Sequence, residues 1–580
     1  MKTLMIGNMA IARGAYEAGV TVATAYPGTP STEIVENISR FEGVYAEWSP
    51  NEKVALEVAF GASLGGARTL VAMKHVGVNV AADPLYTLSY TGVNGGLVLV
   101  SADDPGMHSS QNEQDNRGYG KFAKLLVIEP SDSQEALDFT RESFNLSEQY
   151  DTPVMLRVTT RLCHSQCLVQ PGEKIDRPLK EYKKNEAKYV MLPGFARLRH
   201  LEVEKRMAAL REYVEESPLN RIEWGDRDKG IITSGIAYQY VKEVMPEVSI
   251  LKLGTVNPLP EKLIRSFAAE VKKLYVVEEL EPVIEEQLKA WGIEVTGKSI
   301  LPRTGEYSPE LLEELLLGVP APSGYQLGES IPGRPPLLCP GCPHRGVFYV
   351  LKRKRLTVAG DIGCYTLGAL KPLGAMDSTL CMGASIGTAL GMEKARGTES
   401  ARKTVAVIGD STFVHSGITP LIDAVYNQGN TTVMILDNGT TAMTGHQDHP
   451  ATGRTITEEE TSQLDLEALV RAIGVKRVRK VDPLRIGELE EALDEELSHN
   501  GPSVILACRP CALIDKSPKP SLYIDEDKCK GCKICIKLGC TGVYWLQEER
   551  KARINPDLCV GCGLCIEVCK FDAVLERGAN

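Results

Sequence analysis

Residues 403–411 read Lys403-Thr404-Val405-Ala406-Val407-Ile408-Gly409-Asp410-Ser411, the pattern of a buried parallel strand that ends in Gly-Asp. Residues 415–429 then show helical periodicity, and a second apolar run at 431–436 ends in Asp437-Asn438-Gly439-Thr440. These runs predict a β-α-β unit with polar groups at the carboxyl ends of both strands. Open α/β sheets bind their ligands at that edge.

Asp410 and Asn438 lie 28 positions apart and are expected to converge at one crevice. A carboxylate and an amide oxygen suit Mg²⁺, which leaves room for phosphate oxygens, and Thr440 is a further candidate ligand. Helix amides after Gly409, together with Ser411, would receive a diphosphate. A purely structural turn is the alternative. The pattern resembles the thiamine diphosphate motif, although Ser411 stands where many members carry a second glycine.

Thiamine enzymes also need a glutamate from a second domain to activate the aminopyrimidine ring. Segment 51–66 begins Asn51-Glu52-Lys53-Val54-Ala55-Leu56-Glu57 and continues with small residues at helical spacing, before a strand expected at 69–73. It resembles the pyrimidine-binding segment of that family, which gives Glu52 the activating position and leaves Glu57 as the competing candidate. A glutamate that only complements the helix dipole is the alternative.

The chain has 16 cysteines, and ten of them follow residue 500. Two runs repeat nearly the same pattern: Cys529, Cys532, Cys535 and Cys540 read C-x2-C-x2-C-x4-C, and Cys559, Cys562, Cys565 and Cys569 read C-x2-C-x2-C-x3-C, so the first run has one extra residue. In such repeats three thiolates bind one cluster and the fourth reaches the other cluster. We therefore assign one 4Fe–4S cluster to Cys529, Cys532, Cys535 and Cys569, and a second to Cys540, Cys559, Cys562 and Cys565. Zinc knuckles or disulfides are the alternatives.

The tail resembles a bacterial-type two-cluster ferredoxin, with Thr541 and Lys570 in place of the usual prolines. The 580 residues suggest about four domains. With 65 basic and 76 acidic residues, a net charge of −11 and 6% aromatics, the chain shows no footprint of a nucleic-acid binder. The N-terminus lacks a signal-peptide pattern, and no apolar run approaches the roughly 18 residues of a membrane span. We expect a cytoplasmic protein with no membrane contact.

Five further segments carry a family resemblance. They are Tyr26-Pro27-Gly28-Thr29-Pro30-Ser31-Thr32, Met73-Lys74-His75-Val76-Gly77-Val78-Asn79, residues 102–117 from Ala102 to Arg117, Leu338-Cys339-Pro340-Gly341-Cys342-Pro343-His344-Arg345, and Gly360-Asp361-Ile362-Gly363-Cys364-Tyr365-Thr366-Leu367-Gly368. With the motifs above, they resemble the 2-oxoacid:ferredoxin oxidoreductase family over nearly the whole chain. The second and third segments are specific to the alpha subunits of its indolepyruvate branch.

The resemblance implies that Thr29 contacts the substrate. For the cation that binds the 2-oxoacid carboxylate, Arg117 is the first candidate, because arginine offers a bidentate fork, and Lys74 is the second. His75 and His108 are candidate polar contacts. A structural or surface role is the alternative for each of these residues.

Resemblance to the pyruvate-type relatives also implies a third cluster close to thiamine. Its expected ligands are Cys339, Cys342, Cys364 and, as the fourth, Cys511. Cys508 and Cys381 are rivals for the fourth position, and free thiols or zinc are the alternative reading. The same resemblance places His344 near the diphosphate.

The expected fold is α/β and multidomain. It comprises two thiamine-binding-type doubly wound parallel-sheet domains, a transketolase C-terminal-like α/β domain and a small α+β two-cluster ferredoxin domain. The expected segments are a pyrimidine-binding domain at 1–165, a helical connection at 166–219, the transketolase C-terminal-like domain at 220–325, the diphosphate-binding domain at 326–513 and the ferredoxin domain at 514–580.

The resemblance implies thiamine diphosphate-dependent oxidative decarboxylation of aryl 2-oxoacids such as indolepyruvate. Coenzyme A would take the acyl group as aryl-acetyl-CoA, with release of CO2 and reduction of an external ferredoxin. The resemblance also implies a smaller beta subunit and a hetero-oligomer, with a heterodimer of the two subunits as its expected form. The alternatives are another substrate range, a non-oxidative thiamine decarboxylase, which the eight tail cysteines oppose, and an electron-transfer subunit, which Glu52, Asp410 and Asn438 oppose.

Overall fold

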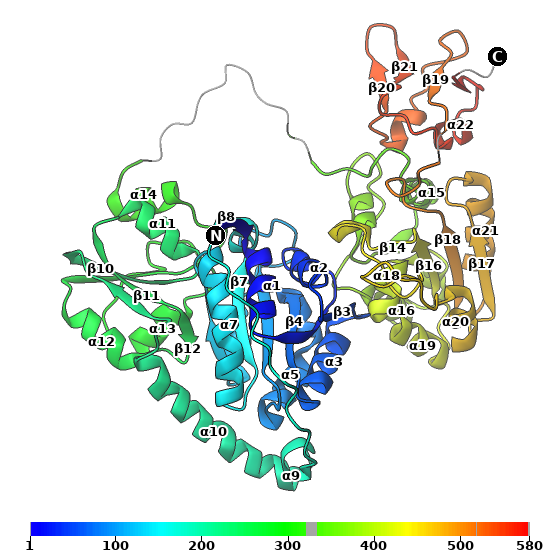
Figure 1. Cartoon of the computed structure of the whole chain (residues 1–580). Coiled ribbons are helices and arrows are strands. Elements are labelled where there is room, and N and C mark those ends of the chain that lie inside the picture. The colour runs from blue at the N-terminus through cyan, green and yellow to red at the C-terminus, as the bar shows by residue number, and fades with distance from the viewer. Residues whose placement is uncertain (1, 321–332, 334, 518, 578–580) are drawn as a thin grey trace. The chain divides into compact units, whose positions relative to one another are not determined.

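The computed structural model describes residues 2–320, 333, 335–517 and 519–577. The chain divides into two compact units, Met1–Gly328 and Glu329–Asn580, each with its own sheets (Figure 1). The domain boundary predicted between residues 325 and 326 lies outside the described residues.

The first unit is built on a seven-stranded sheet of order β12-β6-β7-β5-β4-β2-β3, in which every pairing except β12–β6 is parallel. Its central strands are buried along their whole length, as expected for a parallel sheet with helices on both faces. The strands are β2 (Val20–Ala25), β3 (Tyr45–Trp48), β4 (Arg68–Lys74), β5 (Leu97–Asp103), β6 (Leu126–Ile128), β7 (Val154–Thr159) and β12 (Thr255–Asn257).

Helices connect these strands in the β-α-β manner (Figure 1). They are α1 (Gly7–Glu17), α2 (Thr32–Ile38), α3 (Glu52–Leu64), α4 (His75–Val80), α5 (Ala82–Thr91), α6 (Arg117–Phe122) and α7 (Ser133–Gln149). The long helix α10 (Pro193–Glu215) then leads to a second sheet of order β13-β10-β11-β9. Its strands are β9 (Arg221–Glu223), β10 (Asp226–Ser234), β11 (Val248–Leu253) and β13 (Lys273–Val277).

The two sheets of the first unit share one apolar core. A single buried cluster contains Leu99 of β5 and Leu251 of β11. The segment predicted as a separate domain at 220–325 also supplies β12, which pairs antiparallel with β6 at the edge of the seven-stranded sheet. The segments 1–165 and 220–325 are therefore joined through both core and sheet.

The second unit holds a five-stranded, all-parallel sheet of order β14-β15-β16-β18-β17. Its strands are β14 (Thr357–Ala359), β15 (Thr404–Gly409), β16 (Thr432–Asp437), β17 (Arg477–Val481) and β18 (Ser503–Cys508). Its main helices are α15 (His344–Lys354), α16 (Ala384–Arg396), α19 (Ile418–Tyr426), α20 (Leu466–Ile473) and α21 (Ile486–Ser498). The strands predicted at 403–411 and 431–436 are confirmed as the adjacent parallel pair β15 and β16.

The tail of the second unit consists of two short antiparallel pairs and two short helical turns. The pairs are β19 (Leu522–Ile524) with β22 (Val574–Glu576) and β20 (Val543–Leu546) with β21 (Lys551–Ile554), and the turns are η4 (Cys535–Leu538) and α22 (Leu564–Glu567). One buried apolar cluster contains Leu351 of α15 together with Leu538 and Leu564 of the tail. The tail is thus packed onto the sheet domain of its own unit, and the predicted α/β multidomain class is confirmed.

Candidate functional site

Two neighbouring strands of the second unit end at the predicted diphosphate and metal residues. Asp410 follows β15 and begins the short helix α18 (Asp410–Thr412), and Asn438 follows β16. The Asp410 Oδ2 accepts hydrogen bonds from the backbone N–H groups of Asn438 (3.2 Å) and Gly439 (2.9 Å). The Asn438 side-chain amide has one orientation in which both its oxygen and its nitrogen find suitable hydrogen-bond partners. In that orientation its nitrogen donates to Asp410 Oδ1 (3.1 Å). The structure therefore brings Asp410 and Asn438 together at one edge of the sheet.

The other residues predicted for this edge lie beside Asp410. Ser411 and Thr440 are buried, and their hydroxyl groups form hydrogen bonds within the loop that follows β16. Gly409 lies against the ring of Tyr365, because a Cβ atom added to Gly409 would be 2.8 Å from the ring carbon Cε1. Any larger residue at 409 would have to displace that ring.

Two buried histidines border Asp410. The Nε2 atom of His449 lies 3.4 Å from Asp410 Oδ2, yet it forms no hydrogen bond within the described part of the chain. Sequence reasoning missed His449, because it sits in a loop and belongs to none of the recognised motifs. His344, predicted to approach the diphosphate, is the first residue of α15. Burial lowers the pKa of His344 to about 4, while the charge of Asp410 acts in the opposite direction, so this imidazole is neutral at pH 7.

These residues fit a Mg²⁺ ion bound together with a diphosphate. The groups around Asp410 offer carboxylate, amide and hydroxyl oxygens, and the unpartnered Nε2 atom of His449 is available to a ligand. Within the described ranges, no three His, Cys, Asp or Glu side chains converge on a single ion position. A site completed by an amide oxygen and by cofactor phosphate oxygens needs no such triad.

In the first unit, Glu52 opens helix α3 directly after Asn51, whose side chain caps the helix. The Glu52 side chain is buried against the backbone of α4, because a Cβ atom added to Gly77 would come within 2.6 Å of Glu52 Oε1. The competing candidate, Glu57, is exposed and pairs with Lys53 on the helix surface. The carboxylate held at the β4–α4 junction is therefore that of Glu52.

The predicted substrate residues of the first unit meet where β2 and β4 end. A Cβ atom added to Gly28 would be 3.0 Å from the Cβ atom of Lys74, so the turn that carries Thr29 lies against Lys74. The Lys74 Nζ donates to the carbonyl oxygen (2.7 Å) and hydroxyl (3.2 Å) of Ser109. Burial lowers the pKa of Lys74 to about 8, and the charge of Asp104 acts in the opposite direction. A partly buried cation thus adjoins the Thr29 turn.

The two candidate histidines of this unit differ in their surroundings. His75 is buried, and its Nε2 atom lies 3.2 Å from the side-chain oxygen of Asn112. His108 is about half exposed and lies 3.2 Å from Glu306, which also accepts two hydrogen bonds of 2.7 Å from Arg161. Of the two, only His75 belongs to the strand end that carries Lys74.

Arg117 is enclosed by protein groups and is only 1% exposed. Its Nη2 donates to Asp115 (2.5 Å) and its Nη1 donates to Glu278 (2.7 Å). The Nη2 atom also donates to the carbonyl oxygens of Glu279 and Glu281. A substrate carboxylate would have to displace Asp115 or Glu278 to reach this guanidinium. The structure thus places Arg117 as a bridge between segment 102–117 and the end of β13, away from any open surface.

The eight tail cysteines gather in two groups of four. One pocket is lined by Cys529, Cys532, Cys535 and Cys569. Burial raises the pKa of Cys535 to about 11, and the charges of Cys532 and Cys529 add to the rise. Burial likewise raises the pKa of Cys565, and the charges of Cys562, Cys559 and Cys540 add to this rise. These groups have the membership that the repeat predicts. Binding of iron would deprotonate such thiols. Among the described residues no three of these cysteines converge on the position of a single metal ion.

Three further cysteines, Cys339, Cys342 and Cys511, lie around Cys364. Burial raises the pKa of Cys364 to about 11, and the charges of Cys511 and Cys339 add to the rise. The pKa of Cys342 is raised to about 12 by burial, with Cys339 and Cys364 again contributing. The backbone N–H of Cys511 donates to the carbonyl oxygen of Asn438 (3.0 Å). This group of thiols therefore borders the predicted metal residue.

The two rivals for the fourth position lie elsewhere. Cys508 forms a side-chain hydrogen bond with Asp437, and Cys381 is exposed near Asp361. Neither rival contributes to the pKa of Cys364, whereas Cys511 does. The geometry thus groups Cys511 with Cys339, Cys342 and Cys364.

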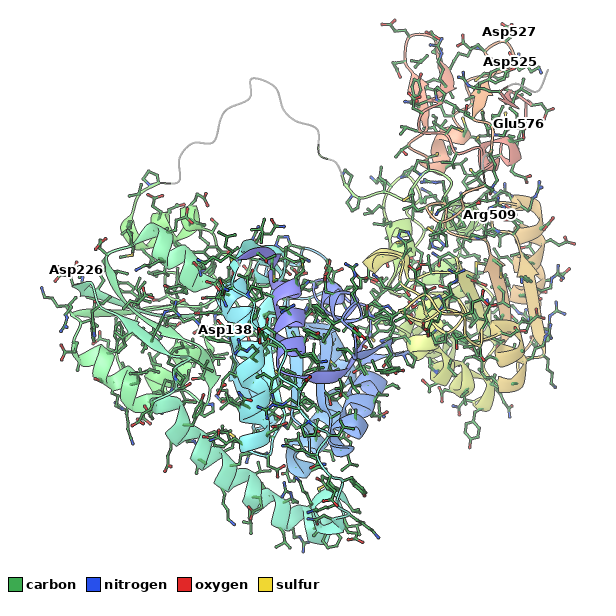
Figure 2. All side chains as sticks on the ribbon, in the orientation of Figure 1. Asp138, Asp226, Arg509, Asp525, Asp527 and Glu576 are labelled. Atoms are coloured by element: carbon green, nitrogen blue, oxygen red, sulfur yellow. The ribbon has the colours of Figure 1, made fainter. Side chains whose placement is uncertain are left out.

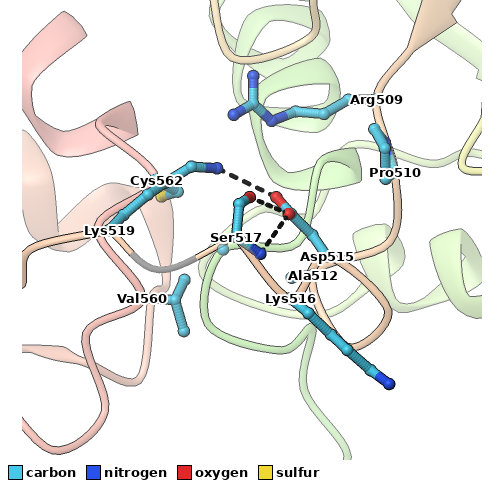
Figure 3. Close-up of a pocket in the computed structure, with 10 residues that line it drawn as sticks. Arg509, Pro510, Ala512, Asp515, Lys516, Ser517, Lys519, Val560 and Cys562 are labelled. Atoms are coloured by element: carbon cyan, nitrogen blue, oxygen red, sulfur yellow. Dashed lines mark hydrogen bonds and ion pairs between the residues drawn. The ribbon is translucent and has the colours of Figure 1, made fainter.

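A cavity of about 220 Å³ lies between this thiol group and the tail (Figure 3). Its lining includes Gly341 and Ala512, which adjoin Cys342 and Cys511 in sequence, and Cys562 of the tail. Arg509 extends into the cavity from the end of β18 and is held by Asp482 (2.6 Å). The cavity thus adjoins Cys562 of the tail and the chain neighbours of Cys342 and Cys511.

Three family models match parts of the chain. A model described as pyruvate flavodoxin/ferredoxin oxidoreductase, thiamine diphosphate-binding, matches residues 13–213, and the C-terminal TPP-binding domain of thiamine pyrophosphate enzymes matches residues 361–507. A 4Fe-4S binding domain matches residues 552–575, which contain the second cysteine run.

Full-length relatives are more specific. The indolepyruvate oxidoreductase subunit IorA of Pyrococcus horikoshii is 43% identical over 99% of this chain and 96% of its own length. The subunit of the same name from Archaeoglobus fulgidus is 43% identical over 92% of this chain and 91% of its own length. The chain belongs to the IorA family.

Membership of the IorA family makes the chain a subunit of a thiamine diphosphate-dependent 2-oxoacid:ferredoxin oxidoreductase and confirms the resemblance found in the sequence motifs. A more distant relative, the ketoisovalerate oxidoreductase subunit VorB of Methanothermobacter thermautotrophicus, is 26% identical over 46% of this chain and 84% of its own length. A solved structure of 2-oxoglutarate:ferredoxin oxidoreductase from Magnetococcus marinus overlaps 55% of this chain and 65% of that chain, with 18% identity and a TM-score of 0.47. Among the described residues, no helix combines the length and apolar character of a membrane span.

Proposed function

We propose that this chain is the catalytic subunit of a coenzyme A-acylating oxidoreductase for aryl 2-oxoacids, with indolepyruvate as the reference substrate. The overall reaction would convert one arylpyruvate and one coenzyme A into one aryl-acetyl-CoA, one CO2 and one proton. The two electrons released would reduce two ferredoxin molecules. A smaller beta subunit would complete the enzyme, in line with the subunit names of the relatives.

One observation carries the oxidative part of this proposal: the hydrogen bond from Cys511 to Asn438 (3.0 Å). It places the thiol group around Cys364 beside the residues that fit Mg²⁺ and diphosphate. A non-oxidative decarboxylase would have no use for an electron acceptor at this position. The proximity therefore supports a third 4Fe–4S cluster as the first electron acceptor.

The chain's own residues would divide the remaining work. Asp410, Asn438 and Thr440 would hold Mg²⁺, and the amides after Gly409 and the hydroxyl of Ser411 would bind the diphosphate. Bound thiamine diphosphate would supply the electron sink for decarboxylation. His344 would contact the diphosphate as a neutral imidazole.

Three residues of the first unit would act on the aminopyrimidine ring and the substrate. Glu52 would share a proton with the ring, Thr29 would contact the 2-oxoacid, and Lys74 would bind its carboxylate. We propose Lys74 in preference to Arg117, because the donors of Arg117 already bind Asp115 and Glu278.

The direct test compares Glu52→Gln with Glu57→Gln in the anaerobically purified complex of both subunits. With indolepyruvate and coenzyme A, wild-type enzyme and Glu57→Gln should reduce ferredoxin, whereas Glu52→Gln should not, although its iron content stays normal. Ferredoxin reduction by Glu52→Gln would overturn the assignment. Iron analysis supplies the cluster count: about twelve irons per chain supports three 4Fe–4S clusters, and about eight removes the Cys339 group.

Substrate range needs a panel, because no motif marks the side-chain pocket. Indolepyruvate, phenylpyruvate and hydroxyphenylpyruvate should all give higher kcat/KM values than pyruvate. A preference for pyruvate would mean that the chain catalyses the same type of reaction on a different range of 2-oxoacids.

A further inference from the structure

The first three cysteines of the two tail runs share their spacing, but the residues between them differ. The first reads Cys529-Lys530-Gly531-Cys532-Lys533-Ile534-Cys535-Ile536-Lys537, and the second reads Cys559-Val560-Gly561-Cys562-Gly563-Leu564-Cys565-Ile566-Glu567. Lys530 and Lys533 therefore occupy the positions of Val560 and Gly563. Because cluster ligation is the same in both runs, the difference points to what each run faces.

The second run faces its own chain. Val560 lies against Gly341, where an added Cβ atom would be 2.3 Å from Val560 Cγ2. Leu564 is buried beside Gly346 at the start of α15. Leu564 thus anchors the run to the sheet domain, whereas Val560 touches Gly341 and still keeps 45% of its surface exposed. These contacts place Cys562 beside the loop that carries Cys342.

The first run begins at the opposite end of the tail and returns to the sheet domain at Leu538, whose carbonyl oxygen accepts a hydrogen bond from Arg345 (2.8 Å). Figure 2 shows Asp525 and Asp527, which precede Cys529 in the chain, at the end of the tail remote from Arg509. Cys532 is exposed, whereas the other tail cysteines are half-buried or buried. Of the two cluster sites, the one that contains Cys532 is therefore the one open to solvent.

Basic residues and one exposed aromatic side chain lie at this opening. Lys530 and Lys533 line the same pocket as Cys532 and Phe571, and the backbone of Arg550 lies against Gly531. Lys530, Lys533 and Arg550 are exposed, and Phe571 is 41% exposed. We call the surface formed by Lys530, Cys532, Lys533, Arg550 and Phe571 the Cys532 face.

The cations of the Cys532 face are available to a partner. Within the described part of the tail, Lys530, Lys533 and Arg550 form no ion pair, and the Lys533 Nζ lies over the ring of Trp545 at 4.3 Å from its centre. The nearby carboxylate of Asp525 is already paired with a lysine of its own loop. A basic surface that includes an exposed aromatic side chain is complementary to an acidic protein.

We propose that the Cys532 face is the docking surface for an acidic one-electron carrier protein, which takes its electron from the cluster held by Cys529, Cys532, Cys535 and Cys569. The inference rests on the proposed function, because electrons must first reach the tail. Each docking event transfers one electron, so that the cluster is oxidised and the carrier is reduced, and no bond is made or broken. Electrons from one substrate molecule thus require two docking events.

The test uses the full anaerobic complex with the double variant Lys530→Glu/Lys533→Glu. One assay follows reduction of an acidic ferredoxin at several salt concentrations, and a second follows reduction of methyl viologen, a small dye that needs no protein docking. We expect the KM for ferredoxin to rise at least about 10-fold relative to the viologen rate, because attraction between complementary charges is replaced by repulsion. The wild-type KM should rise with salt and the variant KM should not, since salt screens exposed charges.

The matched control is Lys183→Glu/Lys184→Glu, which makes the same change in net charge on an exposed segment of the first unit. The separate variant Arg550→Glu repeats the test outside the cysteine run, in case the double variant loses its cluster. The proposal is overturned if both tail variants keep the wild-type KM for ferredoxin, or if the control shifts that KM equally. If wild-type enzyme reduces neither ferredoxin nor viologen, the proposed function fails instead, and the two failures are distinct.

Discussion

Gly341 lies in direct contact with Val560: a Cβ atom added to Gly341 would be 2.3 Å from Val560 Cγ2. Gly341 also has φ +74°, a conformation that favours glycine. This one contact joins the loop that carries Cys339 and Cys342 to the second cysteine run of the tail. The spacing between two proposed redox centres therefore depends on a residue without a side chain.

We expect Gly341→Ala to loosen the tail from the sheet domain, because the new methyl group clashes and the backbone becomes strained. Limited proteolysis should release the tail faster than in the wild-type protein. Val560→Ala combined with Gly341→Ala should recover part of the resistance, since it removes the clash but not the strain. Equal cleavage rates in all three proteins would contradict the contact.

Lys74 leads to a prediction about pH. Burial lowers the pKa of Lys74 from 10.5 to about 8, so its ammonium group is charged below pH 8 and neutral above it. If this cation binds the substrate carboxylate, kcat/KM for the 2-oxoacid should fall as pH rises through about 8, because kcat/KM reports groups of the free enzyme.

Lys74→Arg is the informative variant, because arginine stays charged over this range. The fall near pH 8 should disappear in its pH profile, even if its maximal rate is lower. A fall at the same pH in the arginine variant would assign the titration to another group.

Asp410→Asn should abolish most of the affinity for thiamine diphosphate in the presence of Mg²⁺. Loss of even an outer-shell partner of a metal ligand typically costs about 10–100-fold in affinity, so loss of the carboxylate itself should cost at least as much. Asparagine retains one oxygen that can accept the backbone N–H groups of Asn438 and Gly439, which favours a folded variant. Isothermal titration with the cofactor measures the effect.

Asp423→Asn is the matched control for that titration. Asp423 is an exposed carboxylate on α19 whose hydrogen-bond partner is the nearby Asn427. Cofactor affinity should be unchanged in this variant. Equal affinities in both variants would remove Asp410 from the metal site.

Arg117→Met should destabilise the first unit by about 3–5 kcal/mol, the usual cost of removing one partner from a buried ion pair. Asp115 and Glu278 would be left as buried carboxylates without their cation. A urea titration followed by tryptophan fluorescence measures the shift. Arg303→Met, which removes an arginine that is 59% exposed, should change stability by less than about 1 kcal/mol.

The sequence predicted those features that are encoded within short segments. The strand ending at Gly409-Asp410 and the next strand ending at Asn438 were found because apolar runs and polar ends lie side by side in the chain. The two cysteine groups of the tail were likewise predicted from spacing, and the structure gathers the same residues. Because these two strands are adjacent and parallel, their carboxyl ends lie side by side, and Asp410 and Asn438 meet there.

Features that depend on distant partners were not predictable in this way. Arg117 was the first candidate for the substrate carboxylate, but its partner Glu278 lies 161 residues away and no local pattern reveals it. His449 was missed because its nearness to Asp410 depends on the path of a loop. The strand β12 has only three residues, and its pairing with β6 depends on packing between sheets.

The strand β12 determines where the chain can be truncated for expression. β12 closes the open side of β6, which would otherwise expose unpaired N–H and C=O groups along the rim of the sheet. A fragment ending near residue 213, the limit of the family-model match, would lack this closing strand. We expect such a fragment to be prone to self-association, so that soluble expression of the seven-stranded sheet requires the sequence through β12 and the second sheet that carries it.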